Sequence, residues 1–319
     1  MTNEPVMSVI VLVDRQRQRG ERCLRSLLSQ NIVSQLEILV LDFAASALPP
    51  LAGSDHPSVR VVPMTYATGF GGSRALGVRL ARAPIVAFIE EHVTVRPGWA
   101  EATVRAHQGE WAGVGPEVHN PAPDRPLVNL IFLTGFNAWT APMPAGETRQ
   151  ICSQNSAFKR DVLLRYDAEL ERLLEADILL QWRLREDGYK LYQTPEAQIE
   201  HASEMTLPTI MIGYYWVMRY FAPVRAEMYR WSPLKRLLRL LLTPTAPFYR
   251  TAKVIVGLGR RRSPHFWTAL RGMGATFISH LGGAAGEAVG LIRGRPPRDH
   301  RFLVYEMNTE RATPPAGQD

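Results

Sequence analysis

The stretch that decides the fold is Ala83-Pro84-Ile85-Val86-Ala87-Phe88-Ile89-Glu90-Glu91-His92. Its apolar run predicts a buried strand over 85–89. Because side chains alternate along a strand, we expect Glu90 and His92 on one face and Glu91 on the other. A carboxylate beside an imidazole can hold a divalent metal ion. Ligands of open α/β sheets bind at the carboxyl ends of the strands, so we expect the functional site here.

Strands and helices alternate on both sides of this stretch. Short apolar runs predict strands, and apolar residues three and four apart predict helices. This alternation predicts an α/β fold, Rossmann-like, with a mostly parallel sheet flanked by helices. The predicted strands cover 7–13, 36–41, 59–62, 85–89, 189–193 and 198–201, and the predicted helices cover 74–83, 127–136, 173–185, 207–228, 234–258 and 266–292. A helix is also predicted around Cys23, Leu24, Leu27 and Leu28, and another begins at Pro97-Gly98-Trp99.

The composition is that of a folded protein. The chain has 319 residues, of which 46% are hydrophobic and 21% charged, and this excludes a disordered chain. Cys23 and Cys152 form neither a disulfide framework nor a zinc pattern, which favours a reducing compartment. The first five residues lack the features of a signal peptide, so we expect the active part in the cytoplasm.

The last third of the chain is both basic and apolar. Residues 205–298 hold 15 Lys and Arg against two acidic residues, within a net charge of +7 for the whole chain. This combination predicts contact with an anionic membrane surface, by helices that lie in the interface. A soluble helical subdomain with extended arginine side chains is the competing interpretation. We find no helix-turn-helix, zinc-finger or RNP-type signature, so we expect no nucleic acid partner.

These observations predict three parts. Residues 1–204 form the catalytic domain, 205–298 a basic apolar helical region that associates with a membrane, and 299–319 a polar tail.

The order of motifs in residues 7–204 resembles the family 2 glycosyltransferases, which have the GT-A fold. The resemblance implies transfer of a sugar from a nucleotide-diphosphate sugar, usually with inversion. The motifs that carry it are the strand before Asp42, the glycine-rich turn Gly69-Phe-Gly71-Gly72-Ser-Arg74, Glu90-Glu91-His92, Pro97-Gly98-Trp99, the segment around Asn155, Glu175-Ala-Asp177, and Pro195 to His201.

The resemblance implies a role for each of these side chains. Asp42 would accept a hydrogen bond from the base or ribose, and Arg74 would pair with phosphate. The nucleotide-sugar donor would be bound by Asp42, Arg74, Glu90, Glu91 and Asn155.

The resemblance also implies a metal site and a catalytic base. Glu90, His92 and His201 would hold a divalent cation, Mn²⁺ or Mg²⁺. Asp177 would be the general base that takes the proton of the acceptor hydroxyl, with Glu175 as the runner-up. Acidic residues near a helix start also serve as caps, and an isolated histidine is often structural.

The motifs depart from the usual family pattern at three places. Asp-Asp-Gly-Ser is replaced by Asp42-Phe-Ala-Ala, Asp-x-Asp by Glu90-Glu-His92, and Glu-Asp by Ala176-Asp177. The function we predict is transfer to a lipid-linked or glycan acceptor in cell-envelope or exopolysaccharide synthesis, at the cytoplasmic face of the plasma membrane. The alternatives are a non-catalytic GT-A-like scaffold subunit of a polysaccharide complex and a nucleotidyltransferase.

Overall fold

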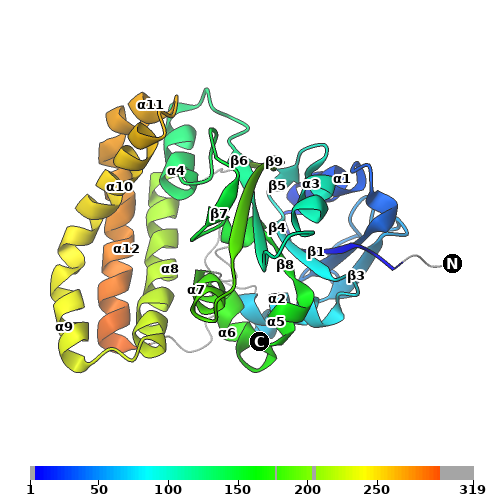
Figure 1. The fold of residues 1–319 in the computed structure, drawn as a ribbon, viewed down its shortest axis with the longest axis horizontal. Helices are drawn as coiled ribbons and strands as arrows, with labels where there is room; N and C mark the ends of the chain where they lie inside the picture. Colours follow the sequence, from blue (N-terminus) through cyan, green and yellow to red (C-terminus); the bar gives the residue numbers. More distant parts are fainter. Residues whose placement is uncertain (1–3, 177, 203–205, 295–319) are drawn as a thin grey trace.

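The computed structural model describes residues 4–176, 178–202 and 206–294 (Figure 1). A sheet with its covering helices forms one side of the molecule, and a bundle of longer helices forms the other. Residues 4–176 and 178–202 form the sheet side, except that their helix α4 lies beside the bundle, and residues 206–294 form the rest of the bundle.

One mixed sheet runs through the first part. Its strand order is β3-β2-β1-β4-β8-β6-β9-β5, and β7 pairs with β9. The first four strands of the chain are parallel to one another, whereas β8 is antiparallel to both of its neighbours, and β5 and β7 are antiparallel to β9. The strands are β1 Met7–Val13, β2 Leu36–Asp42, β3 Val59–Pro63, β4 Ile85–Glu90, β5 Val93–Val95, β6 Gly113–His119, β7 Gly146–Thr148, β8 Ala157–Lys159 and β9 Leu191–His201.

Helices cover both faces of this sheet, so its central strands are apolar on both faces. All seven residues of β1 and all seven of β2 are buried. Ile10 and Leu12 of β1 pack with residues of α2, α6 and α7, while Val9 and Val11 pack with residues of α1 and α3. These helices are α1 Arg17–Leu28, α2 Phe70–Leu80, α3 Trp99–Ala106, α4 Pro126–Phe136, α5 Arg160–Leu164, α6 Leu170–Glu175 and α7 Ile178–Glu186.

The helical region is built around two long helices in close contact. A Cβ atom at Gly282 of α12 would lie 2.1 Å from the carbonyl oxygen of Met211 in α8, and one at Gly286 would lie 2.1 Å from that of Tyr215. Glycine at these positions therefore lets α8 and α12 approach each other. The helices of this region are α8 Leu207–Met228, α9 Pro233–Leu242, α10 Ala246–Arg260, α11 Phe266–Arg271 and α12 Met273–Arg293.

Several predicted elements have different bounds. The glycine-rich segment predicted as a turn before Arg74 is the first turn of α2, with Gly69 as its N-cap at a φ of 72°. The two strands predicted at 189–193 and 198–201 are the single strand β9. Its pairing with β6 passes from Thr194 directly to Gln198, so three residues bulge out between them.

Three predicted helices are each divided in two. The helix predicted over 173–185 is α6 and α7, the segment 234–258 is α9 and α10 joined by a short turn at Thr243–Thr245, and the segment 266–292 is α11 and α12. In the part of the chain that the structure describes, no helix combines the length and hydrophobicity needed to cross a membrane. The division into three parts stays a prediction, and the tail 299–319 lies outside the described residues.

Candidate functional site

The end of β4 and the end of β9 meet at one edge of the sheet. β4 ends at Glu90, the turn Glu91-His92 follows, and β5 begins at Val93. Because β9 runs antiparallel to β5 with His201 opposite Val93, its last residue comes to lie beside His92. Two segments 109 residues apart in the sequence are thus brought into contact.

Three side chains converge at this edge. The Nε2 atoms of His92 and His201 are 3.0 Å apart. Oε2 of Glu90 lies 3.3 Å from Nε2 of His201 and 3.8 Å from Nε2 of His92. One ligand atom of each residue lies within 4.8 Å of the others. Two ligand atoms about 2.1 Å from one ion are about 3.0 Å apart in an octahedron and about 3.4 Å apart in a tetrahedron. The three side chains therefore fit a single divalent cation.

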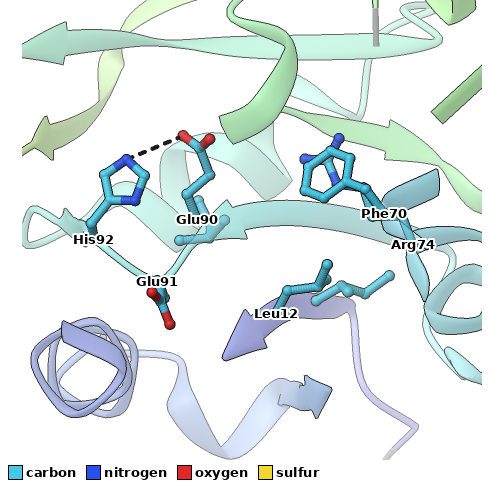
Figure 2. A pocket seen from close by; sticks show the side chains of 8 residues that line it. Leu12, Phe70, Arg74, Glu90, Glu91 and His92 are labelled. Atoms are coloured by element: carbon cyan, nitrogen blue, oxygen red, sulfur yellow. Dashed lines mark ion pairs between the residues drawn. The ribbon is translucent and has the colours of Figure 1, made fainter. Parts of the chain in front are cut away.

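The physical reason for this convergence differs from the one that the sequence suggested. Strand alternation was expected to place Glu90 and His92 on one face, but the strand ends at Glu90 and the turn carries His92 back toward it. Figure 2 shows the two side chains pointing toward each other and Glu91 pointing away. The structure brings Glu90, His92 and His201 together, and their role as ligands stays a prediction.

Asn155 holds Glu90 in place. Its Nδ2 donates to Oε2 of Glu90 at 2.8 Å, and its Oδ1 accepts from the backbone N–H of Glu90 at 3.0 Å. Burial opposes ionisation of Glu90, but His92, His201 and the Asn155 amide outweigh it and lower its pKa to about 2. The carboxylate is therefore charged at neutral pH. The ring of Phe136 covers His201, with the ring centroids 4.2 Å apart.

Glu91 lies apart from this cluster. It is buried, and its Oε2 accepts from the backbone N–H of Asp14 at 3.2 Å. Among the described residues, no donor reaches its other oxygen, Oε1. Burial is the main reason that the pKa of Glu91 is raised, to about 8. Its predicted contact with the donor stays a prediction.

Asp42 lies at the end of β2 and is already hydrogen-bonded within the protein. Nη1 of Arg17 is 2.9 Å from each of its carboxylate oxygens, and the backbone N–H of Ala44 donates to Oδ1 at 2.9 Å. Nearby, the hydroxyl of Tyr66 donates to the carboxylate of Asp14, which follows β1. Asp14 was not predicted from the sequence, although it directly follows the buried strand β1, a position similar to that of Asp42 at the end of β2.

Arg74 is buried between two aromatic rings. Its guanidinium carbon is 4.6 Å from the ring centroid of Phe70 and 4.7 Å from that of Phe88, and Nη2 donates to the carbonyl oxygen of Gln154. A small pocket joins Arg74 to the cluster at the end of β4 (Figure 2). It is lined by Ile10, Leu12, Phe70, Arg74, Ile89, Glu90, Glu91 and His92.

Of the two candidate bases, the structure describes only Glu175. Asp177 lies outside the described residues. Oε2 of Glu175 accepts from the backbone N–H of Gly71 at 2.7 Å, which satisfies one free donor at the first turn of α2. The structure therefore gives Glu175 a capping contact.

Residues 8–166 match the profile of a family described as Glycosyl transferase family 2. The chain belongs to this family. The predicted family is thereby confirmed, and with it the enzyme class. A search of the curated proteins finds no match for this glycosyltransferase.

Two solved structures share its fold. A mannosyltransferase from Pyrobaculum calidifontis in complex with GDP-Man and Mn²⁺ has 18% identity and a TM-score of 0.54, over 92% of this chain and 87% of that one. GalNAc-T7 with UDP, GalNAc and Mn²⁺ has 12% identity and a TM-score of 0.50, over 64% of this chain. The match spans 44% of the length of GalNAc-T7. These likenesses confirm the predicted GT-A fold.

Proposed function

We propose that this family 2 glycosyltransferase moves a sugar from a nucleotide-diphosphate sugar to a hydroxyl group of its acceptor, with inversion. The observation that carries the proposal is the convergence of Glu90, His92 and His201 beside a pocket that Glu90, His92 and Arg74 line. Both solved structures named above hold a nucleotide and Mn²⁺. A cation bound by these residues would offset the negative charge that develops on the diphosphate leaving group.

The donor set favours Mn²⁺ over Mg²⁺. Glu90 is ionised at neutral pH and supplies one oxygen, while His92 and His201 supply nitrogen. Mg²⁺ prefers an all-oxygen shell, whereas imidazole suits the later transition metals. Asn155 donates to the Glu90 carboxylate and accepts from the backbone N–H of Glu90, so this ligand needs little reorganisation.

The remaining roles follow from the positions of the side chains. Arg74 is oriented by two aromatic rings and would donate to a phosphate oxygen of the donor. Asp177 remains our candidate for the general base, since the runner-up Glu175 already bonds to Gly71. The base would remove the acceptor proton while the hydroxyl oxygen attacks the anomeric carbon.

The acceptor that we propose is a lipid-linked sugar or a glycan of the cell envelope or an exopolysaccharide. The basic and apolar composition of 205–298 supports it, because such a region binds a negatively charged membrane surface. We place the enzyme at the cytoplasmic face of the plasma membrane, where nucleotide sugars are available.

The proposal is tested by donor turnover. We would supply the purified full chain with Mn²⁺ and a panel of UDP- and GDP-sugars, and measure release of the nucleoside diphosphate. Glu90→Gln and His201→Asn should each lower this release by about a hundredfold or more. Glu200→Gln is the matched control, because Glu200 precedes His201 on β9 and its carboxylate pairs with Arg96 instead.

Three outcomes would contradict the proposal. If the Glu90→Gln, His201→Asn double variant released nucleoside diphosphate as fast as the unaltered protein, the proposed cation site would be excluded. No binding of any nucleotide sugar in calorimetry, with or without Mn²⁺, would favour a non-catalytic scaffold. The contacts that Asp42 already makes with Arg17 and Ala44 are the observation that makes this scaffold worth testing. Pyrophosphate as the product would assign a nucleotidyltransferase.

A further inference from the structure

Helix α9 presents nearly its whole surface to the outside. Nine of its ten residues are exposed and Leu240 is half-buried. Five of its leucines are between 51% and 67% exposed, a large apolar area for so short a helix. They are Leu234, Leu237, Leu238, Leu241 and Leu242.

The apolar stripe of α9 faces away from the protein. Leu234, Leu238 and Leu241 recur at intervals of four and three residues, the spacing of one helix face. On the surface of a globular protein such a face normally lies against the core. Here the face is turned outward, which is the orientation of a helix that lies in a membrane interface.

The inner side of α9 is held by cations around one indole ring. Nζ of Lys235 lies 5.1 Å from the ring centroid of Trp231, and the guanidinium carbons of Arg225 and Arg239 lie 5.4 Å or less from it. Cations within about 6 Å of an aromatic face are attracted to it. This contact fixes one side of the helix against the bundle and leaves the leucines outward.

The surroundings of α9 are strongly basic. Residues 206–294 contain 13 Lys and Arg and two acidic residues. One of the two, Glu287, forms ion pairs with Arg225 and Arg250 within the bundle. Arg236 of α9 itself is exposed. A surface of this charge is complementary to phosphate-bearing lipid headgroups.

Large exposed apolar side chains continue beyond α9. Phe248 and Tyr249 of α10 are 66% and 69% exposed, and Trp267 of α11 is 62% exposed. Figure 1 shows α9, α10 and α11 along the edge of the molecule that lies farthest from β3. Aromatic side chains are favoured at the boundary between headgroups and acyl chains.

We propose that α9 lies in the surface of an anionic membrane, with its leucines among the acyl chains and its basic side chains at the phosphates. The inference rests on the proposed function for the location of the acceptor, and it assigns the anchoring to one helix. A second copy of this chain is the alternative occupant of this face. The excess of Lys and Arg over acidic residues in 206–294 favours an anionic surface over a second basic one.

Sedimentation with lipid vesicles tests this assignment on the full chain. The protein should bind vesicles of phosphatidylcholine with phosphatidylglycerol more tightly than vesicles of phosphatidylcholine alone. The Leu237→Ser, Leu241→Ser double variant should bind both about tenfold or more weakly, because the acyl-chain contacts are lost. Val61→Ser is the control, since Val61 is an exposed apolar residue on the distant strand β3 and should have no effect. Lys235→Gln and Arg236→Gln should each lower binding to the anionic vesicles alone, by about fivefold.

Several results would overturn the inference. Equal binding of the unaltered protein to neutral and anionic vesicles would exclude the charge contribution, and unchanged binding by the leucine variant would exclude α9. A dimer in solution that the leucine variant dissociates, without vesicle binding, would assign the face to a second copy. Donor turnover in detergent-free buffer, measured on the same samples, separates this outcome from failure of the proposed function. The leucine variant should retain that turnover.

Discussion

The sheet region and the helical region place the same side chain in opposite surroundings. Leu39 of β2 is fully buried between two layers of helices, whereas Leu237 of α9 is 51% exposed. Both belong to apolar patterns that predict regular secondary structure, and both do lie in such elements. The pattern therefore determines the element, but the neighbouring segments decide whether its apolar face is covered.

The two regions also differ in how they use charge. At the carboxyl ends of β1, β2 and β4, acidic groups are held by specific donors, as Asp42 is by Arg17 and Glu90 is by Asn155. In the helical region cations far outnumber acidic groups. The first arrangement suits a defined site for a small ligand, and the second suits a broad anionic surface. Four predictions test this contrast.

The largest effect that we expect concerns the chemistry assigned to the sheet region. Asp177→Asn should lower kcat by about 10²–10⁴-fold, because the amide cannot take the acceptor proton. Glu175→Gln should retain most of the activity, since its amide oxygen can still accept from the N–H of Gly71. Steady-state release of nucleoside diphosphate measures both. The reverse order of effects would make Glu175 the base.

The next prediction compares the effect of a leucine-to-alanine substitution on stability in the sheet region and in the helical region. Leu39→Ala should lower the free energy of unfolding by about 2–5 kcal/mol, because it leaves a cavity in the core. Leu237→Ala should change it by less than about 0.5 kcal/mol in the absence of lipid. Urea unfolding followed by circular dichroism compares the two. A large loss at Leu237 would mean that α9 is part of the packed core.

Two glycine substitutions in α12 test how closely this helix packs against α8. Gly286→Ala should destabilise the protein by about 3 kcal/mol, since its Cβ would meet the backbone of Tyr215. Gly274→Ala, at the start of the same helix with nothing within 4 Å of the added atom, should stabilise by roughly 0.5–1 kcal/mol. Thermal unfolding of the two variants gives the comparison. Equal effects would contradict the close approach of α8 and α12.

The last prediction concerns the buried carboxyl group of Glu91. Its pKa is raised to about 8 in the folded protein, so the folded state keeps a proton that the unfolded chain loses above about pH 5. Stability should therefore fall as the pH rises from roughly 5 to 8, by up to about 1.4 kcal/mol per pH unit from this group. In Glu91→Gln this fall should be absent. Urea unfolding of the metal-free protein and of the Glu91→Gln variant at pH 5, 6.5 and 8 measures this difference. The same dependence of stability on pH in both proteins would contradict the prediction.

Much of the fold could be predicted because its central strands are continuous apolar runs. The strand predicted over 7–13 agrees with β1, and those over 36–41, 59–62 and 85–89 differ from β2, β3 and β4 by one residue at the end. β5, β7 and β8 were missed because each has three residues, too few to show a period. The seven residues of β6 were missed as well, since glycine and proline interrupt their apolar run. The start of α2 was missed because its first turn is rich in glycine, which has low helix propensity.

The candidate site shows what a local pattern cannot contain. The spacing of two residues was enough to predict that Glu90 and His92 lie close together, although the turn that joins them could not be predicted. His201 was proposed from the family resemblance, because only the pairing of β5 with β9 brings it near. The contact of Asn155 with Glu90 likewise depends on tertiary structure. Arg17 gave no signal in the sequence, since arginines that bind a carboxylate look like any surface arginine.

The bulge in β9 has a consequence for how this enzyme tolerates insertions and deletions. Its three extra residues, 195–197, are an odd number, and in a strand each step turns the side chain to the opposite face. The pairing of β9 with β5 and β6 after the bulge places His201 beside His92 and Glu200 beside Arg96. A deletion in the bulge that shifted this register by one residue would exchange the faces of Glu200 and His201, and would so remove His201 from its place beside Glu90 and His92.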